Sequence, residues 1–138
     1  MNIQGEIKLL EDLERSRANF AYKCVKEAIG KFGEKSETLK EYRSYLRKIP
    51  SMVLNNGLGQ TLAFIKSKSK GGNAYDIILK QLTNYFKSHS PARIRITQDD
   101  ILLWAISLSS EDYRFVTEEL LSLINWMKRF AEGMIESD

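Results

Sequence analysis

Apolar residues recur at intervals of three and four along nearly the whole chain. This spacing places them on one face of an α-helix and predicts helices rather than strands. One stretch, residues 93–96, alternates between basic and apolar residues, but it is too short to form a sheet without partners. The predicted helices cover residues 7–32, 37–48, 51–68 and 74–89, a short segment after Thr97, and a long segment after Ser109.

Proline and glycine set the expected helix boundaries in the centre of the chain. Pro50 lacks a backbone N–H, so we expect it to stop the second helix and to open the third. Gly57 and Gly59 then fall inside the third helix, where each costs about 1 kcal/mol relative to alanine. They either permit close helix packing or mark a bend. The polar side chains around them are expected to hydrogen-bond buried backbone groups: Asn55, Asn56 and Gln60.

Capping residues define the last two predicted helices. Thr97, with Asp100 three residues later, is typical of a helix start, and Ser109 with Asp112 repeats the pattern. The adjacent acids Asp99 and Asp100 could also be interpreted as a metal or acid–base pair. We prefer the capping interpretation, because acids in a first helical turn stabilise the helix dipole.

These elements predict an all-α fold, a compact bundle of about five to six helices that forms a single domain over residues 1–138. The least ordered parts are expected to be the N-terminal 12 residues and the loops at about 66–73 and 88–97. The loop at 66–73 is basic and rich in glycine and serine.

Composition places the chain among intracellular globular proteins. Of its 138 residues, 43% are hydrophobic, which is typical of a folded domain. A single cysteine, Cys24, cannot form an internal disulfide and is expected to be a buried apolar residue. No apolar run reaches the roughly 18 residues that span a membrane, and the N-terminus does not resemble a signal peptide. We therefore expect a cytoplasmic protein that has no contact with membranes.

Charge is unevenly distributed along the chain. Residues 39–95 contain eleven Lys or Arg and only two acids, whereas residues 96–138 contain three Lys or Arg and nine acids. Such asymmetry indicates contact with a polyanion, self-association, or both. It is equally compatible with two solvated faces that have no partner.

The sequence lacks the residues that most enzymes use. His89, the one histidine, lies beside a loop proline, and Cys24 is the one thiol, so no zinc-ligand set and no supported Cys–His nucleophile is present. We expect no catalytic residue, no metal, no cofactor and no small-molecule substrate.

Three stretches resemble the small-subunit family of the type III-B (Cmr) CRISPR effector complexes. The most specific covers residues 42–64, with Pro50, the run Asn-Gly-Leu-Gly-Gln at 56–60, and a trailing Leu-Ala-Phe. The second begins at residues 113–118 and closes with Asn-Trp-Met-Lys-Arg-Phe-Ala-Glu-Gly-Met at 125–134. A weaker third covers residues 15–25. The first dozen residues and residues 87–100 match no part of the family pattern.

The resemblance implies an all-helical, non-catalytic subunit of an antiviral ribonucleoprotein. Several copies would stack head-to-tail beside the backbone subunits that hold the guide RNA, and they would help line the channel where target RNA pairs with the guide. The implied partners are the guide RNA/target RNA backbone, other Cmr subunits and further copies of this chain. RNA cleavage would belong to the backbone subunits.

The predicted RNA-binding residues come from the basic part of the chain. Lys66, Lys68 and Lys70 border a Gly-Gly loop that could follow a phosphate backbone, and Arg43 and Arg47 are one helical turn apart. The full predicted set is Arg43, Arg47, Lys48, Lys66, Lys68, Lys70, Arg93 and Arg95. The alternative function is a helical protein-interaction adaptor whose basic patch meets an acidic protein partner.

Overall fold

A computed structural model describes residues 2–137 and contains helices without strands over that range, which confirms the all-α prediction. The order is α1 (Ile3–Phe32), α2 (Glu37–Asn56), α3 (Leu58–Lys68), α4 (Ala74–Ser88), the short 3₁₀-helix η1 (Ala92–Ile94), α5 (Ile101–Ile106) and α6 (Ser110–Met134). None of the helices in the described range is both long and apolar enough to cross a membrane.

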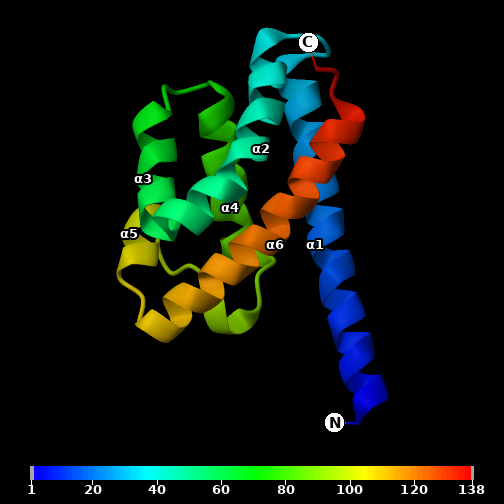
Figure 1. The fold of residues 1–138 in the computed structure, drawn as a ribbon, viewed down its shortest axis with the longest axis vertical. Helices are drawn as coiled ribbons and strands as arrows, with labels where there is room; N and C mark the ends of the chain where they lie inside the picture. Colours follow the sequence, from blue (N-terminus) through cyan, green and yellow to red (C-terminus); the bar gives the residue numbers. More distant parts are fainter. Residues whose placement is uncertain (1, 138) are drawn as a thin grey trace.

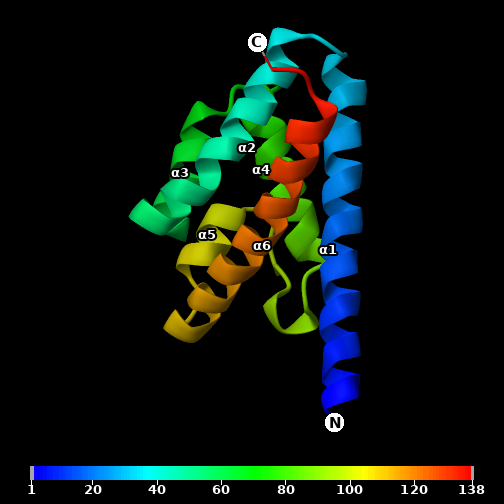
Figure 2. The same cartoon turned by 45° about the vertical axis from the view of Figure 1, so that its right-hand side comes forward.

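The helices pack as a bundle around one apolar core. The long helix α1 lies along α6, and α6 also packs against α2 (Figure 1). The helices α3 and α5 lie on the side of the bundle away from α1, as both views show (Figure 2). The largest fully buried side chains come from α2, α3, α4 and α6: Tyr42, Leu46, Ile49, Leu58, Leu62, Ile65, Ile78, Leu82, Tyr85, Phe86, Leu120 and Leu123.

The first helix starts earlier than the sequence pattern indicates. It begins at Ile3 rather than Ile7, with Asn2 as the N-cap whose side chain accepts a hydrogen bond from the Gly5 N–H at 2.8 Å. The N-terminal turns extend beyond the rest of the bundle (Figures 1 and 2). Leu10, on these turns, is largely exposed.

The prediction that Pro50 stops the second helix is wrong, because α2 continues through Pro50 to Asn56. The missing N–H weakens the helix there, and α2 changes direction along its length (Figure 1). The break falls at Gly57, whose φ of 88° favours glycine and whose N–H bonds to the Val53 carbonyl at 2.9 Å. Gly57 therefore separates α2 from α3.

The other glycine permits a close approach between helices. The Gly59 N–H donates to the Tyr113 hydroxyl at 2.7 Å, and a Cβ on Gly59 would lie 3.3 Å from both that hydroxyl and Ile106 Cγ2. The prediction that the amide side chains near these glycines bond to buried backbone groups is wrong. The side chains of Asn55, Asn56 and Gln60 are exposed.

The capping prediction holds for one of the two helices. Ser109 caps α6 and accepts from the Asp112 N–H at 3.2 Å. Thr97, however, does not cap α5. Asp100 is itself the N-cap and accepts from the N–H groups of Leu102 and Leu103, because the helix starts three residues later than expected.

Hydrogen bonds to a single carboxylate shape the glycine-rich loop before α4. Asp76 Oδ2 accepts from the backbone N–H groups of Lys70, Gly72 and Asn73 at 2.7 to 3.0 Å, and Asn73 and Asp76 form a capping box. Partial desolvation raises the pKa of Asp76, but these N–H groups outweigh it and lower the pKa below its usual value.

Candidate nucleic-acid interface

The three loop lysines of the predicted set differ in their surroundings. Lys66 Nζ forms an ion pair with Asp100 Oδ2 at 2.8 Å, across 34 residues of sequence. Lys68 Nζ lies 5.7 Å from the Phe64 ring centroid, and Lys70 is exposed. The bond to Lys66 is the main cause that lowers the pKa of Asp100. Lys66 therefore already ties α3 to α5.

The two arginines after α4 also make contacts within the chain. Arg93 pairs with Glu111 at 2.9 Å and with Asp112 at 3.2 Å, and the bond to Glu111 is the main cause that raises the pKa of Arg93. Arg95 Nε donates to the Ser90 carbonyl at 2.8 Å. These contacts fix the segment around η1 against α4 and the start of α6.

The loop around Lys70 and the segment around η1 lie at opposite ends of α4. Lys70 precedes α4, and Arg93 and Arg95 follow it. Because α4 has 15 residues, its ends are about 22 Å apart. Lys66, in contrast, lies beside Asp100 and shares a hollow with Thr83 of α4.

The helix α2 presents its basic residues differently. Arg47 and Lys48 are exposed, and neither forms an ion pair within the described residues. Arg43 lies one turn before Arg47 and is half-buried, and its Nε finds no acceptor among residues 2–137. These side chains are available to a negatively charged partner in a way that Lys66 and Arg93 are not.

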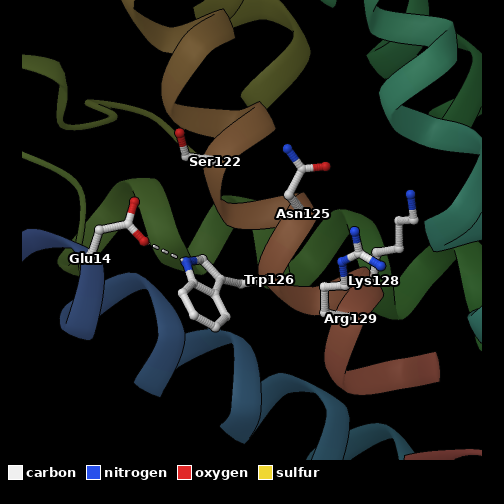
Figure 3. A pocket seen from close by; sticks show the side chains of 6 residues that line it. All are labelled: Glu14, Ser122, Asn125, Trp126, Lys128 and Arg129. Carbon is white, nitrogen blue, oxygen red and sulfur yellow. Dashed lines mark hydrogen bonds between the residues drawn. The ribbon is translucent and has the colours of Figure 1, made fainter. Parts of the chain in front are cut away.

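A hollow of about 450 Å³ adds two further cations from α6 (Figure 3). Lys128 and Arg129 extend from α6 towards the side where α2 lies, and no carboxylate in the described range pairs with either. The other lining residues are polar or aromatic: Glu14, Ser122, Asn125 and Trp126. An anion placed here would meet unpaired positive charge and amide and hydroxyl groups.

Contacts between α1 and α6 hold the wall of this hollow. The Trp126 Nε1–H donates to Glu14 Oε2 at 2.9 Å, and its ring stacks on Phe130 with centroids 5.6 Å apart. Deeper between the helices, Arg17 donates to both oxygens of the buried Glu119 at 3.0 and 2.7 Å. That bond raises the pKa of Arg17, and Tyr85 donates to the same carboxylate.

Partly exposed aromatic rings border the loop lysines. Tyr45 and Tyr75 stack with centroids 3.8 Å apart, and Phe64 meets Tyr75 edge-on at 5.9 Å. A hydrogen bond to Glu41 raises the pKa of Tyr45 to about 12. Of the two tryptophans, Trp104 is buried in the core, and only Trp126 reaches the surface.

The titratable groups outside these surfaces have ordinary structural surroundings. His89 packs at 4.6 Å from the Phe20 ring, and its Nδ1 lies 2.8 Å from the Ser88 hydroxyl. Burial raises the pKa of the Cys24 thiol to about 12. Asp99 pairs with Lys87 at 2.6 Å, which lowers the pKa of Asp99. No group of three or more potential metal ligands occurs in the part of the chain that the structure describes.

Sequence reasoning omitted Lys128 and Arg129 from the predicted set. Both belong to the acidic C-terminal third, so the charge count there draws attention away from them. Their position in the motif at residues 125–134 was the one indication available.

Fold and surface together define a small all-helical protein with unpaired cations on α2 and α6. Residues 13–134 match the family described as CRISPR-associated protein (Cas_Cmr5). A Thermus thermophilus protein named CRISPR system Cmr subunit Cmr5 is 33% identical over 120 residues, which is 86% of this chain and 92% of that protein. The crystal structure of a CRISPR-associated Cmr5 family protein, also from Thermus thermophilus, superimposes with a TM-score of 0.70 at 30% identity, over 90% of this chain and 97% of that one.

This chain therefore belongs to the Cmr5 family of CRISPR-associated proteins. The resemblance predicted from the residues is confirmed.

Proposed function

We propose that this chain is the non-catalytic small subunit of a type III-B Cmr complex and that its α2–α6 surface lies against the RNA backbone. Membership of the Cmr5 family supports the place in the complex. In this proposal several copies stack along the guide RNA/target RNA channel in the cytoplasm, and other subunits cleave the RNA.

The observation that carries the RNA contact is the set of unpaired cations on two adjacent helices. Arg47 and Lys48 on α2, and Lys128 and Arg129 on α6, have no carboxylate partner within residues 2–137. The two helices pack against each other, and the proposal places these cations along one strand of RNA. Contacts to phosphates neutralise such charges without reading base sequence, which suits a subunit that must accept any guide.

Among the predicted residues, Lys66 and Arg93 contribute least in this proposal. Each would have to break an ion pair within the chain before it could bind a phosphate. Lys68, Lys70 and Arg95 form secondary contacts at the edges of the bundle, and Arg43 supports Arg47.

A charge-removal experiment in the assembled complex tests the proposal. The triple variant Lys48→Ala, Lys128→Ala, Arg129→Ala, which leaves Arg47 in place, is incorporated into reconstituted Cmr complex, and binding of single-stranded target RNA is measured over a salt series. If three phosphate contacts are lost, the slope of log affinity against log salt falls by about two.

A matched control removes the same charge from α1. The triple variant Lys23→Ala, Lys26→Ala, Lys31→Ala replaces three exposed lysines that have no carboxylate partner among the described residues. It is expected to leave the slope unchanged. Equal slopes for both triple variants would disprove the α2–α6 interface. An α2–α6 variant that binds RNA normally but no longer joins the complex would favour the adaptor function.

A further inference from the structure

The inward face of α1 continues past the end of the bundle with nothing of its own chain beneath it. Ile3, Ile7 and Leu10 lie on one stripe and are 73%, 49% and 63% exposed. Eighteen residues make about five helical turns, so the positions 18 residues later lie on the same face. Those positions are fully buried in the core: Ala21, Val25 and Ala28.

This N-terminal arm, residues 3–12, lies outside the part of the chain that the Cmr5 family match covers, which starts at residue 13. The matched residues therefore do not include the arm. An exposed apolar stripe on such an extension has no role in the core, and it costs solubility unless a partner covers it.

A second uncovered apolar patch lies on the opposite side of the bundle. It consists of Leu54 at the end of α2, and of Leu103 and Ile106 one turn apart on α5, which are 75%, 50% and 59% exposed. Ile106 lies against Gly59 at the α2–α3 turn, which places the patch at this turn. Figures 1 and 2 both show α5 and α1 on opposite sides of the molecule. We refer to these three residues as the turn patch.

The charges beside the two surfaces are complementary. Within the arm, Glu6 and Glu11 flank the stripe, whereas Asp12 lies on the far side and pairs with Arg15. The charged residues that line the apolar groove at the base of the arm are Glu11, Glu14 and Arg15. On α2, Arg47 lies two turns before Leu54, on the same face of the helix, and has no carboxylate partner in the described range. The arm therefore offers an apolar stripe flanked by acidic residues, and the turn patch offers an apolar surface beside an unpaired arginine, so the two surfaces are complementary in both polarity and charge.

We propose that the arm of one copy docks with its apolar stripe on the turn patch of the next copy. This inference rests on the proposed function, in which copies stack along the RNA, and it names the surfaces that make the contact. Because the two surfaces differ and face opposite ways, the contact is heterologous and builds an open row of subunits rather than a closed dimer. Six aliphatic side chains are fewer than a standard interface of about 1,600 Å² contains, so alignment along RNA strengthens the contact through effective concentration.

Photo-crosslinking of the full-length chain identifies the partner directly. p-Benzoylphenylalanine is introduced in place of Leu10, and the purified protein is irradiated at high concentration and in reconstituted Cmr complex. The expected product joins two copies, and mass spectrometry places the second attachment in α5 or at the end of α2. A crosslink from arm to arm, a crosslink to a different subunit, or no crosslink between copies in the complex would each overturn the proposal.

Substitutions on the arm test the contribution of the stripe. The double variant Ile7→Glu, Leu10→Glu is expected to weaken self-association about tenfold or more in sedimentation equilibrium, as is Ile106→Glu on the patch. Lys8→Glu, on the opposite face of the same arm, is the matched control and should have an effect of less than about threefold. Circular dichroism confirms that each variant is folded. If the double variant associates as the wild type does, the inference is wrong.

The two proposals fail separately. RNA affinity that depends on Lys48, Lys128 and Arg129, without an arm-to-patch crosslink, would retain the proposed function and remove this inference. An arm-to-patch crosslink in a complex whose RNA binding ignores those three cations would do the reverse.

Discussion

Two groups of charges on α6 have opposite surroundings. Glu119 faces α1, is buried, and accepts hydrogen bonds from Arg17 and Tyr85. Lys128 and Arg129, a few turns later, face the hollow and have no ion pair within the described residues. Both groups belong to one helix with an acidic overall charge, so local charge density does not distinguish them. What distinguishes them is whether a partner is supplied by the same chain.

The comparison explains why an arginine stands in the apolar stripe of α1. At position 17 the stripe would normally carry an aliphatic residue, but the side chain is used to neutralise Glu119, which is only 3% exposed. A buried ion pair of this kind adds little net stability, yet removing one member is costly because it leaves an uncompensated charge. Buried charges of this kind are neutralised within the chain, whereas unpaired exposed charges are available for binding.

The largest effect is expected from breaking the buried pair. Arg17→Met should lower the free energy of unfolding by about 3 kcal/mol, because Glu119 would remain buried without its cation. Urea unfolding measures the difference. Arg15→Met is the matched control, since the Arg15–Asp12 pair is exposed on the same helix, and it should change stability by about 0.5 kcal/mol or less. Equal losses in the two variants would show that burial of the pair is unimportant.

A smaller effect, of opposite sign on the free energy of unfolding, is expected at Arg43. This side chain is partly buried like Arg17 but unpaired like Lys128 and Arg129. Its Nε is buried without an acceptor in residues 2–137, so the folded state bears a desolvation cost. Arg43→Met should leave stability unchanged or raise it by about 1 kcal/mol, and it should weaken RNA binding by the complex a few-fold. A clear loss of stability would mean that Arg43 belongs with Arg17 among the charges that hold the fold.

The smallest effect is expected at the exposed pair of Lys66 and Asp100. The folded-state pKa of Asp100 lies below its usual value, so its stabilising contribution is present above about pH 4 and is lost as the pH falls through the folded-state pKa. Asp100→Asn, which retains an acceptor for the α5 cap, should cost less than about 1 kcal/mol at neutral pH.

Unfolding measured at decreasing pH tests whether the contribution of Asp100 to stability is lost in acid. The stability of wild type and Asp100→Asn should converge once the pH has fallen below the folded-state pKa of Asp100, because Asp100 is then protonated in the wild type. A difference between the two that persisted or grew at lower pH would contradict the assignment of the shift to this pair.

The sequence predicted the helical fold because apolar spacing is a local property. It predicted boundaries less well where two local rules compete. Pro50 is a helix breaker, but the positive φ of Gly57 provides the actual end, and α2 tolerates the missing N–H by bending. At α5, Thr97 and Asp100 are both acceptable caps, and the packing of Ile101 and Trp104 in the core selects Asp100.

The candidate site was less predictable, because ion pairing depends on contacts across long stretches of sequence. Lys66 meets Asp100 across 34 residues, and Arg93 meets Glu111 across 18. No periodicity in the sequence reports such pairs, so the basic segment appeared uniform. The same limit hid Lys128 and Arg129, because Glu132, one turn away on α6, forms no ion pair with either within the described residues.

Cys24 makes the closure of α1 on α4 observable without altering the protein. Its backbone carbonyl accepts from the Gln81 side chain at 2.9 Å, and the thiol is buried, with a pKa of about 12. Since only the thiolate reacts readily, a disulfide reagent can modify this chain at neutral pH only during moments when the two helices separate. The rate of thiol labelling thus measures how often α1 and α4 separate by local unfolding. If labelling is slower in the assembled complex than in the free subunit, the ratio of the two rates measures how strongly the adjacent subunits suppress this local opening.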